Sequence, residues 1–279
     1  MLELSKKSII SLCQQVGLLP HRSAGQNFLF NKKINQQIIE VSSLKPDDLV
    51  LEIGSGFGFL TDDIAARVKK IVAVELDRRL AFFLKNKFAR RKNIEIIQAD
   101  IFKVDLNTYF KDLNYKLISN LPYNITSLVL RNFLTLRPRP KEMIILVQKE
   151  VAQRITALPG KMSLLAVFTQ FYSSPKIILE AGKEYFWPRP EINSTLIKLE
   201  NIGINRFNVN EMNFAKLVKI GFSAKRKKLT NNLKHGLGIS AEISEKILKE
   251  LKLPLKVRAQ ELSLENWLNL TKQFFDILG

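Results

Sequence analysis

The sequence predicts an α/β protein, with a Rossmann-like domain built on a mostly parallel sheet and a small all-helical C-terminal domain after it. Three observations support this prediction. Short apolar runs rich in Val and Ile alternate with amphipathic stretches over roughly the first 200 residues, as a parallel sheet with crossover helices requires. A glycine-rich turn follows the first of these runs. In the remaining residues, apolar side chains recur only at helical spacing.

The expected strands share short length, β-branched side chains and little charge, which is typical of strands buried on both faces. They cover residues 49–53, 71–74, 94–97, 116–119, 142–147 and 194–199. Between them, residues 61–68 and 78–88 place apolar side chains on one face and Arg or Lys on the other. This spacing predicts helices that cover the sheet.

The pattern loosens into Asn, Gly and Arg near residues 200–210. Helical periods return after that segment, at residues 212–222, 225–234, 241–251 and 264–275. We therefore expect a Rossmann-like domain at residues 1–202 and a basic helical domain at residues 203–279.

Composition narrows the class of protein. The chain has 279 residues, of which 46% are hydrophobic, and no apolar run approaches the roughly 18 residues of a membrane helix. Residues 1–16 lack the apolar centre and cleavage site of a signal peptide. A soluble, cytoplasmic protein is expected. With one Cys and two His, neither a disulfide nor a zinc site is expected.

Charge indicates the kind of partner. The formal net charge is +18, which favours a polyanion over a neutral small molecule alone. Residues 201–260 hold 13 Lys and Arg against 4 Glu. The basic run Lys225, Arg226, Lys227 and Lys228 lies in a stretch without any acid, residues 212–241. We expect this run to lie on a helix and to contact the phosphates of a nucleic acid; a merely solvated basic face is the alternative.

Polar residues and glycine recur at the ends of successive expected strands. Gly54 begins the glycine-rich turn, and Glu75, Asp100 and Asn120 close the next three strands. Parallel strands bring their carboxyl ends to one sheet edge, where such folds bind ligands. There Glu75 can accept both hydroxyls of a ribose and Asp100 can accept from an adenine amino group. A tight structural turn and helix-capping acids are the alternatives.

Asn120, Leu121, Pro122 and Tyr123 directly follow the fourth strand and form the most specific motif. The Asn side-chain oxygen and the Leu121 carbonyl can accept the two hydrogens of an exocyclic amine, while Pro122 stiffens the turn and Tyr123 can stack on a base. Held in this way, an adenine nitrogen can attack a methyl donor without a strong base. Phe186 supplies a second aromatic ring for a flipped base, or else packs in the core.

Taken together, these motifs resemble the ribosomal RNA adenine dimethyltransferase family over nearly the whole chain, and within it the bacterial small-subunit branch. The matching segments occur in the family's order and spacing. They are residues 25–29, 52–56, 74–77, 98–100, 120–125, 148–151, 186–190 and 222–233. One departure is Ser55, where the family usually has Pro between the glycines.

The resemblance implies an enzyme that uses S-adenosyl-L-methionine and no metal. The residues that it assigns to the cofactor are Asn27, Leu29, Gly54, Gly56, Glu75, Asp100 and Asn120. It also implies dimethylation of the N6 amino groups of two adjacent adenosines, in a hairpin loop near the 3′ end of 16S rRNA. The expected partner is 16S rRNA within the small ribosomal subunit or its precursor, and the expected state is a monomer.

Four alternatives stay open from sequence alone. A large-subunit rRNA methyltransferase of the macrolide-resistance type shares the cofactor motifs, and a DNA adenine methyltransferase has a similar catalytic motif. A non-catalytic ribosome-assembly factor could keep the same fold. An NAD-dependent dehydrogenase would use the glycine turn and Glu75 but does not require the motif at residues 120–123.

Overall fold

The computed structural model describes residues 3–20, 25–111, 114–136, 138–203 and 207–278, with residues 276–278 described by their backbone only. The chain divides into two compact units: unit 1 comprises residues 1–152 and 173–203, and unit 2 comprises residues 153–172 and 204–279. The domain boundary expected after residue 202 stays a prediction. Residues 204–206, just beyond it, lie outside the described residues.

Unit 1 is built on a seven-stranded sheet with the strand order β4-β3-β2-β5-β6-β9-β7. The neighbouring strands β4, β3, β2, β5 and β6 pair in parallel. Strand β9 is antiparallel to both β6 and β7. The strand bounds are β2 (Leu49–Ile53), β3 (Lys70–Glu75), β4 (Ile94–Gln98), β5 (Tyr115–Asn120), β6 (Glu142–Gln148), β7 (Ser174–Ala181) and β9 (Ser194–Glu200). The central strands β2, β3 and β5 are buried at nearly every position, which explains their continuous apolar sequences.

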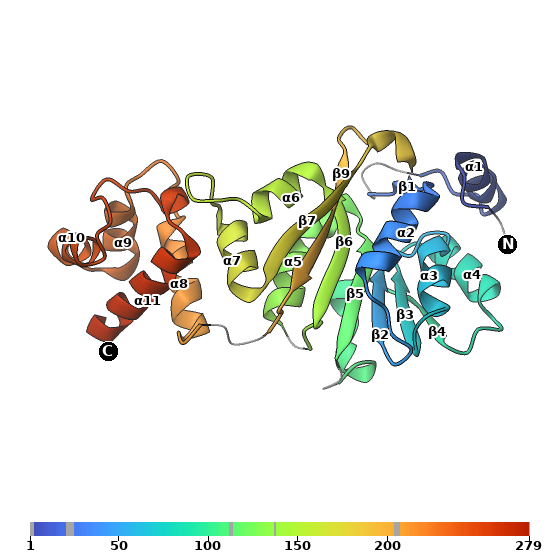
Figure 1. The fold of residues 1–279 in the computed structure, drawn as a ribbon, viewed down its shortest axis with the longest axis horizontal. Coiled ribbons are helices and arrows are strands. Elements are labelled where there is room, and N and C mark those ends of the chain that lie inside the picture. Colours follow the sequence, from blue (N-terminus) through green and yellow to red (C-terminus); the bar gives the residue numbers. More distant parts are fainter. Residues whose placement is uncertain (1–2, 21–24, 112–113, 137, 204–206, 279) are drawn as a thin grey trace. The chain divides into compact units, whose positions relative to one another are not determined.

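Helices α2 (Lys32–Val41) and α3 (Phe59–Ala65) lie along one face of this sheet (Figure 1). Ile38 and Ile64, both 0% exposed, join one apolar cluster with side chains of β2, β5 and β6. Helix α4 (Arg78–Lys87) packs on β3 and β4. Its first turn is capped by Asp77, whose carboxylate accepts from the Arg79 N–H at 2.9 Å.

A second apolar cluster forms where helix α1 (Lys6–Gln15) packs near the glycine-rich turn. Ile9 and Leu12 contribute from α1, Phe57 from the turn and Leu80 from α4. The rings of Phe28 and Phe57 lie 4.9 Å apart. This cluster fixes the N-terminal segment over the carboxyl ends of β2 and β3, the sheet edge that the sequence marks as the ligand site.

The remaining elements of unit 1 are short or flank the sheet. They include the short strands β1 (Phe28–Leu29) and β8 (Phe186–Trp187) and the helix α5 (Thr126–Thr135). Four 3-10 helices in the described residues, labelled η, are η2 (Ile101–Lys103), η3 (Leu106–Thr108), η4 (Tyr123–Ile125) and η5 (Lys183–Tyr185). Helix α6 (Lys149–Ile155) begins in unit 1 and ends in unit 2. Strands β1 and β8 pair antiparallel, with Leu29 opposite Phe186.

The described part of unit 2 is helical. Its elements are α7 (Leu164–Tyr172), α8 (Glu211–Gly221), α9 (Leu229–Leu237), α10 (Ala241–Glu250), η6 (Ala259–Glu261) and α11 (Leu264–Leu278). The Phe171 and Phe214 rings stack at 3.9 Å between α7 and α8. The Trp267 ring of α11 is fully buried and lies so close to Gly221 that a Cβ there would be 2.2 Å from it.

The predicted fold class is confirmed: a mostly parallel sheet is followed by helices. All six expected strands are present, each within one residue at either end. The prediction of a helix over residues 225–234 is wrong at its start, because α9 begins at Leu229 and the basic run forms the turn before it. Strand β7 was not predicted. In the described residues, no helix is long and apolar enough to span a membrane.

Candidate active site

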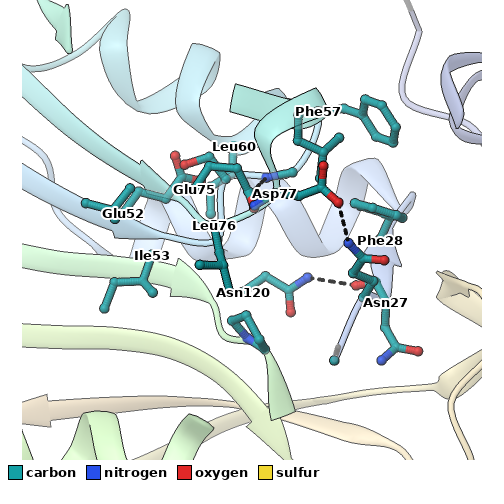
Figure 2. A pocket seen from close by; sticks show the side chains of 18 of the residues that line it. Asn27, Phe28, Glu52, Ile53, Phe57, Leu60, Glu75, Leu76, Asp77 and Asn120 are labelled. Atoms are coloured by element: carbon teal, nitrogen blue, oxygen red, sulfur yellow. Dashed lines mark hydrogen bonds between the residues drawn. The ribbon is translucent and has the colours of Figure 1, made fainter. Parts of the chain in front are cut away.

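A pocket of about 270 Å³ opens at the carboxyl ends of β2, β3, β4 and β5. Figure 2 shows residues of the N-terminal segment, of the glycine-rich turn and of the strand ends that line it, among them Asn27, Glu75 and Asn120. The predicted site residues that line it are Asn27, Leu29, Gly54, Gly56, Glu75, Asp100, Asn120 and Pro122. The structure therefore brings together every residue expected at the cofactor.

The glycine-rich turn has a backbone that only glycine adopts easily. Gly54 has φ +73° and Gly56 has φ +57°, both in the left-handed region. A Cβ on Gly54 would lie 3.0 Å from Pro122 Cγ, and one on Gly56 would lie 3.1 Å from the Phe28 ring. The turn is thus in contact with both the 120–123 motif and the N-terminal segment, so the three parts of the pocket constrain one another.

Glu75 closes β3 with its carboxylate facing the turn. One oxygen accepts from the Gly56 N–H at 2.9 Å and the other from the Asp77 N–H at 3.0 Å. Burial raises the pKa of this carboxyl above its ordinary value, while the two N–H groups oppose that shift. Since each carboxylate oxygen can accept more than one hydrogen bond, Glu75 can still receive two hydroxyl groups from a ligand.

Glu52 is a second buried acid, on the floor of the pocket. It accepts a hydrogen bond of 2.5 Å from the Thr61 hydroxyl at the start of α3. Burial raises the pKa of Glu52 to about 7. Lys87, whose pKa burial lowers, donates to the carbonyls of Phe57 and Gly58 at 2.9 and 3.0 Å. Lys87 therefore holds the glycine-rich turn by its carbonyls, while Glu75 holds it by the Gly56 N–H.

Asn120 ends β5 with its side chain in the pocket. Its amide nitrogen donates to the backbone carbonyl of Asn27 at 3.3 Å (Figure 2). With the nitrogen so engaged, the amide oxygen is the atom available to a substrate. The Oδ1 atom of Asn27 is buried with no hydrogen-bond partner among the described residues, and such an atom in a pocket indicates a missing ligand donor.

The loop that follows Asn120 is anchored on both sides. The Leu121 N–H donates to the Leu146 carbonyl at 3.2 Å, and the Ser119 hydroxyl donates to the Ile53 carbonyl at 2.6 Å. The Tyr123 hydroxyl lies 2.6 Å from the Ser194 hydroxyl on β9. Burial raises the pKa of Tyr123. Leu121 is buried and Tyr123 half-buried, and neither belongs to the pocket lining.

Phe186 also lies away from the pocket lining. Its side chain is 2% exposed and packs in the apolar cluster under α2 and α3. It is brought there by the β1–β8 pairing, which sets it opposite Leu29. The base-stacking role expected for Phe186 stays a prediction, and it requires the ring to leave this core position.

The basic run of unit 2 is exposed at every position. Lys228 is the N-cap residue of α9, and Lys225, Arg226 and Lys227 lie in the turn between α8 and α9. Because these residues form a turn and not a helix, their charged side chains are not distributed over several helix faces. Their contact with RNA stays a prediction.

Several residues that line the pocket were not predicted from the sequence. Leu76 is 68% exposed at the rim, and Asn35 of α2 reaches the pocket while donating to Asp63 at 2.5 Å. Leu76 could have been found as the apolar residue next to the strand-end acid. Asn35 gave no such signal, because only the packing of α2 on the sheet brings it to the pocket.

Comparison with known proteins identifies the family. The family model for ribosomal RNA adenine dimethylase matches residues 18–275, which is most of the chain. The chain belongs to the ribosomal RNA adenine dimethylase family. The resemblance found in the motifs is confirmed, as is the predicted enzyme class, an rRNA adenine dimethyltransferase.

Curated members of this family are similar along nearly their full length. The ribosomal RNA small subunit methyltransferase A of Dehalococcoides mccartyi (strain CBDB1) is 37% identical over 259 residues, which cover 92% of this chain and 89% of the relative. The protein of the same name from Malacoplasma penetrans (strain HF-2) is 35% identical over 277 residues and covers 98% of both chains.

Solved structures agree on the dimethylase fold. A dimethyladenosine transferase from Plasmodium falciparum superposes with a TM-score of 0.78 at 24% identity, covering 89% of this chain and 98% of that one. The 23S rRNA methyltransferase ErmE superposes with a TM-score of 0.72 at 24% identity, covering 88% and 98%. A protein named dimethyladenosine transferase and one named 23S rRNA methyltransferase thus share this fold, and the fold alone does not distinguish their substrates.

Proposed function

We propose that this dimethylase binds S-adenosylmethionine in the pocket of unit 1 and transfers its methyl group to the N6 atom of adenines in 16S rRNA. The observation that carries the proposal is the orientation of Asn120. Its amide nitrogen is engaged by Asn27, so its oxygen can accept from an amine brought to the end of β5.

The residues of the pocket fit this cofactor. S-adenosylmethionine supplies an electrophilic methyl group on a sulfonium centre. Glu75 can accept from the two ribose hydroxyls, and Asp100, which lines the same pocket, can accept from the adenine amine. The exposed Leu76 offers apolar surface to the flat base. The unpartnered Asn27 oxygen is suited to an ammonium donor such as that of the methionyl part.

The target amine needs two acceptors. We assign these to the Asn120 side-chain oxygen and the Leu121 backbone carbonyl, which together hold both N–H groups and direct the nitrogen lone pair towards the methyl group. The hydrogen bonds stabilise the positive charge that develops on the amine as it is methylated. As the methyl group passes from sulfur to nitrogen, S-adenosylhomocysteine is left and the methylated amine loses one proton to solvent. The amine then keeps one N–H, so one acceptor suffices to hold it for the second transfer.

The assignment to 16S rRNA rests on the relatives. Those described above are named ribosomal RNA small subunit methyltransferase A, and the identity extends over both units. On the same basis we propose the small ribosomal subunit or its precursor as the substrate particle, the cytoplasm as the location, and a monomer as the active state. The choice of two adjacent adenosines near the 3′ end is part of this proposal.

A competition experiment tests the substrate assignment. Unmethylated small subunits, unmethylated large subunits and adenine-containing duplex DNA are offered together with labelled S-adenosylmethionine. Label in the small-subunit RNA alone is the expected result. Label mainly in large-subunit RNA or in DNA would overturn the assignment while keeping the chemistry, and no label despite cofactor binding would favour a non-catalytic assembly factor.

A further inference from the structure

Helix α4 presents an exposed aromatic ring within a basic surface that the proposed site does not use. Residues 78–94 contain seven Lys and Arg and no acid. Phe82 lies on the outer side of α4 and is 68% exposed. A singly exposed hydrophobic side chain is common on protein surfaces, but Phe82 is the only aromatic residue among the exposed large hydrophobic side chains of the described residues.

The ring and two cations share one row on α4. Arg78, Phe82 and Lys85 follow one another at spacings of four and three residues, which places neighbouring side chains side by side on a helix. The side chains of Leu80 and Leu84 are buried and lie on the opposite side of α4, where Leu80 packs in the apolar cluster with α1 and Phe57. All three members of the row are exposed. We refer to Arg78, Phe82 and Lys85 as the α4 row.

The two cations of the α4 row form no ion pair with an acid of the described residues. Arg79, beside Arg78, forms an ion pair with Asp77 at 2.8 Å and donates to the Gly17 carbonyl at 2.9 Å. In the described part of the chain, Arg78 and Lys85 take part in no ion pair. Their charges therefore face solvent and can meet an external anion.

The α4 row begins at the rim of the pocket. Leu76, Asp77 and Leu80 line the pocket, and Arg78 lies between them in the sequence. A strand whose target base enters the pocket thus has flanking nucleotides within reach of α4. Aromatic side chains between cations are the usual means by which proteins hold unpaired nucleotides, the ring stacking on a base and the cations meeting phosphates.

We propose that the α4 row is a second RNA-contacting surface of the enzyme, in which Phe82 stacks on an unpaired base and Arg78 and Lys85 contact backbone phosphates of the same strand. This inference rests on the proposed function, since it takes ribosomal RNA as the substrate. It adds a contact within unit 1 to the basic run of unit 2.

The test compares variants of the row with a control that removes the same charge elsewhere. Phe82→Ala removes the ring, Phe82→Trp keeps an aromatic face, and Arg78→Gln with Lys85→Gln removes two charges. The control is Lys45→Gln with Lys69→Gln. Both lysines are exposed and precede β2 and β3, at the sheet edge opposite the pocket. Affinity is measured for protein-free unmethylated 16S rRNA and for unmethylated small subunits, over a range of salt concentrations.

We expect Phe82→Ala to weaken binding of both RNA and particles by about 10-fold, and Phe82→Trp to bind like the unchanged enzyme. The double Gln variant should reduce the slope of log affinity against log salt by about 1.4, since each phosphate contact on an unpaired strand contributes about 0.7. The Lys45 and Lys69 control should change neither quantity by as much, and cofactor affinity should be the same in all variants.

Unchanged RNA affinity in Phe82→Ala, or equal losses in the control, would overturn the inference. A loss seen with particles but not with free RNA would also overturn it, in favour of a ribosomal protein as the occupant. Methyl transfer by the unchanged enzyme distinguishes failure of this inference from failure of the proposed function. If the enzyme methylates 16S rRNA and the variants still bind RNA normally, only the inference about the α4 row fails. If the unchanged enzyme transfers no methyl to rRNA, the proposed function itself fails.

Discussion

The side-chain nitrogen of Asn120 donates a hydrogen bond to the backbone carbonyl oxygen of Asn27, 3.3 Å away. This bond joins residues 93 positions apart and ties the N-terminal segment to the end of the fourth parallel strand. It also fixes which end of the Asn120 amide faces a substrate. Replacing the donor by an acceptor should therefore harm catalysis even where the shape is kept.

Asn120→Asp tests that orientation. An ionised carboxylate has two acceptors and no donor, so one of its oxygens would be repelled by the Asn27 carbonyl. We expect the single-turnover rate of methyl transfer to fall by about 100- to 1,000-fold, the range seen when a preorganised transition-state contact is removed. Asn120→Ala should fall as far. An Asp variant with near-normal rate would show that the bond to Asn27 does not orient the residue.

Gly54→Ala tests the contact between the glycine turn and Pro122. The new Cβ would lie 3.0 Å from Pro122 Cγ on a backbone with φ +73°, and backbone strain alone costs about 1 to 3 kcal/mol. Gly17→Ala is the matched control, because it has φ +64° with nothing within 4 Å of the added Cβ. Calorimetric titration with S-adenosylmethionine should show reduced affinity in Gly54→Ala and normal affinity in Gly17→Ala.

Much of this geometry can be predicted from the sequence. The strands β2, β3, β5, β6 and β9 are apolar because they are largely buried, so their bounds could be predicted, as could those of the β-branched, partly buried β4. The residues at the carboxyl ends of β2 to β5 converge because these strands are parallel. The edge strand β7 was missed because residues 174–181 mix Lys, Glu and Pro with Ile and Leu, which is the composition of a half-exposed edge.

Other features depend on contacts distant in sequence. In the sequence, Phe186 is an aromatic residue next to a proline-containing turn, which does not tell whether its ring is buried. The ring enters the core because Phe186 pairs with Leu29, which is distant in sequence. The start of α9 was misplaced because Lys and Arg are good helix formers, while the observed helix begins where Leu229 becomes buried. The orientation of Asn120 likewise depends on Asn27, far away along the chain.

Glu52 predicts a specific pH dependence of stability. Burial raises its pKa from 4.5 to about 7 in the folded protein, so between these values the folded state binds a proton that the unfolded state has released. Stability from this group is complete below about pH 4.5 and is lost as pH rises through about 7. The loss amounts to about 3 kcal/mol.

Glu52→Gln removes this titration. Relative to the unchanged protein, the variant should gain stability progressively from about pH 4.5 to about pH 7.5, as measured by urea unfolding at several pH values. A free-energy difference that stays constant over this range would contradict the raised pKa. Glu40→Gln, at an exposed residue of α2, serves as the control and should show no such trend.

The basic run of unit 2 should supply affinity without sequence selectivity. Arg226, Lys227 and Lys228, changed together to Gln, should lower the salt dependence of small-subunit binding by about one unit of log–log slope for each phosphate that the variant no longer neutralises. S-adenosylmethionine affinity should stay unchanged. A triple Gln variant at the exposed residues Lys249, Lys252 and Lys256 removes the same charge. If both triples behave alike, the run has no special role.

The most direct measurement is nucleoside analysis of unmethylated small subunits after incubation with S-adenosylmethionine and either the unchanged enzyme or Asn120→Ala. We expect N6,N6-dimethyladenosine in 16S rRNA with the unchanged enzyme and almost none with the variant, at S-adenosylmethionine concentrations that saturate both proteins. Absence of dimethyladenosine with the unchanged enzyme, or equal amounts with the variant, would contradict the proposed role of the pocket and of Asn120.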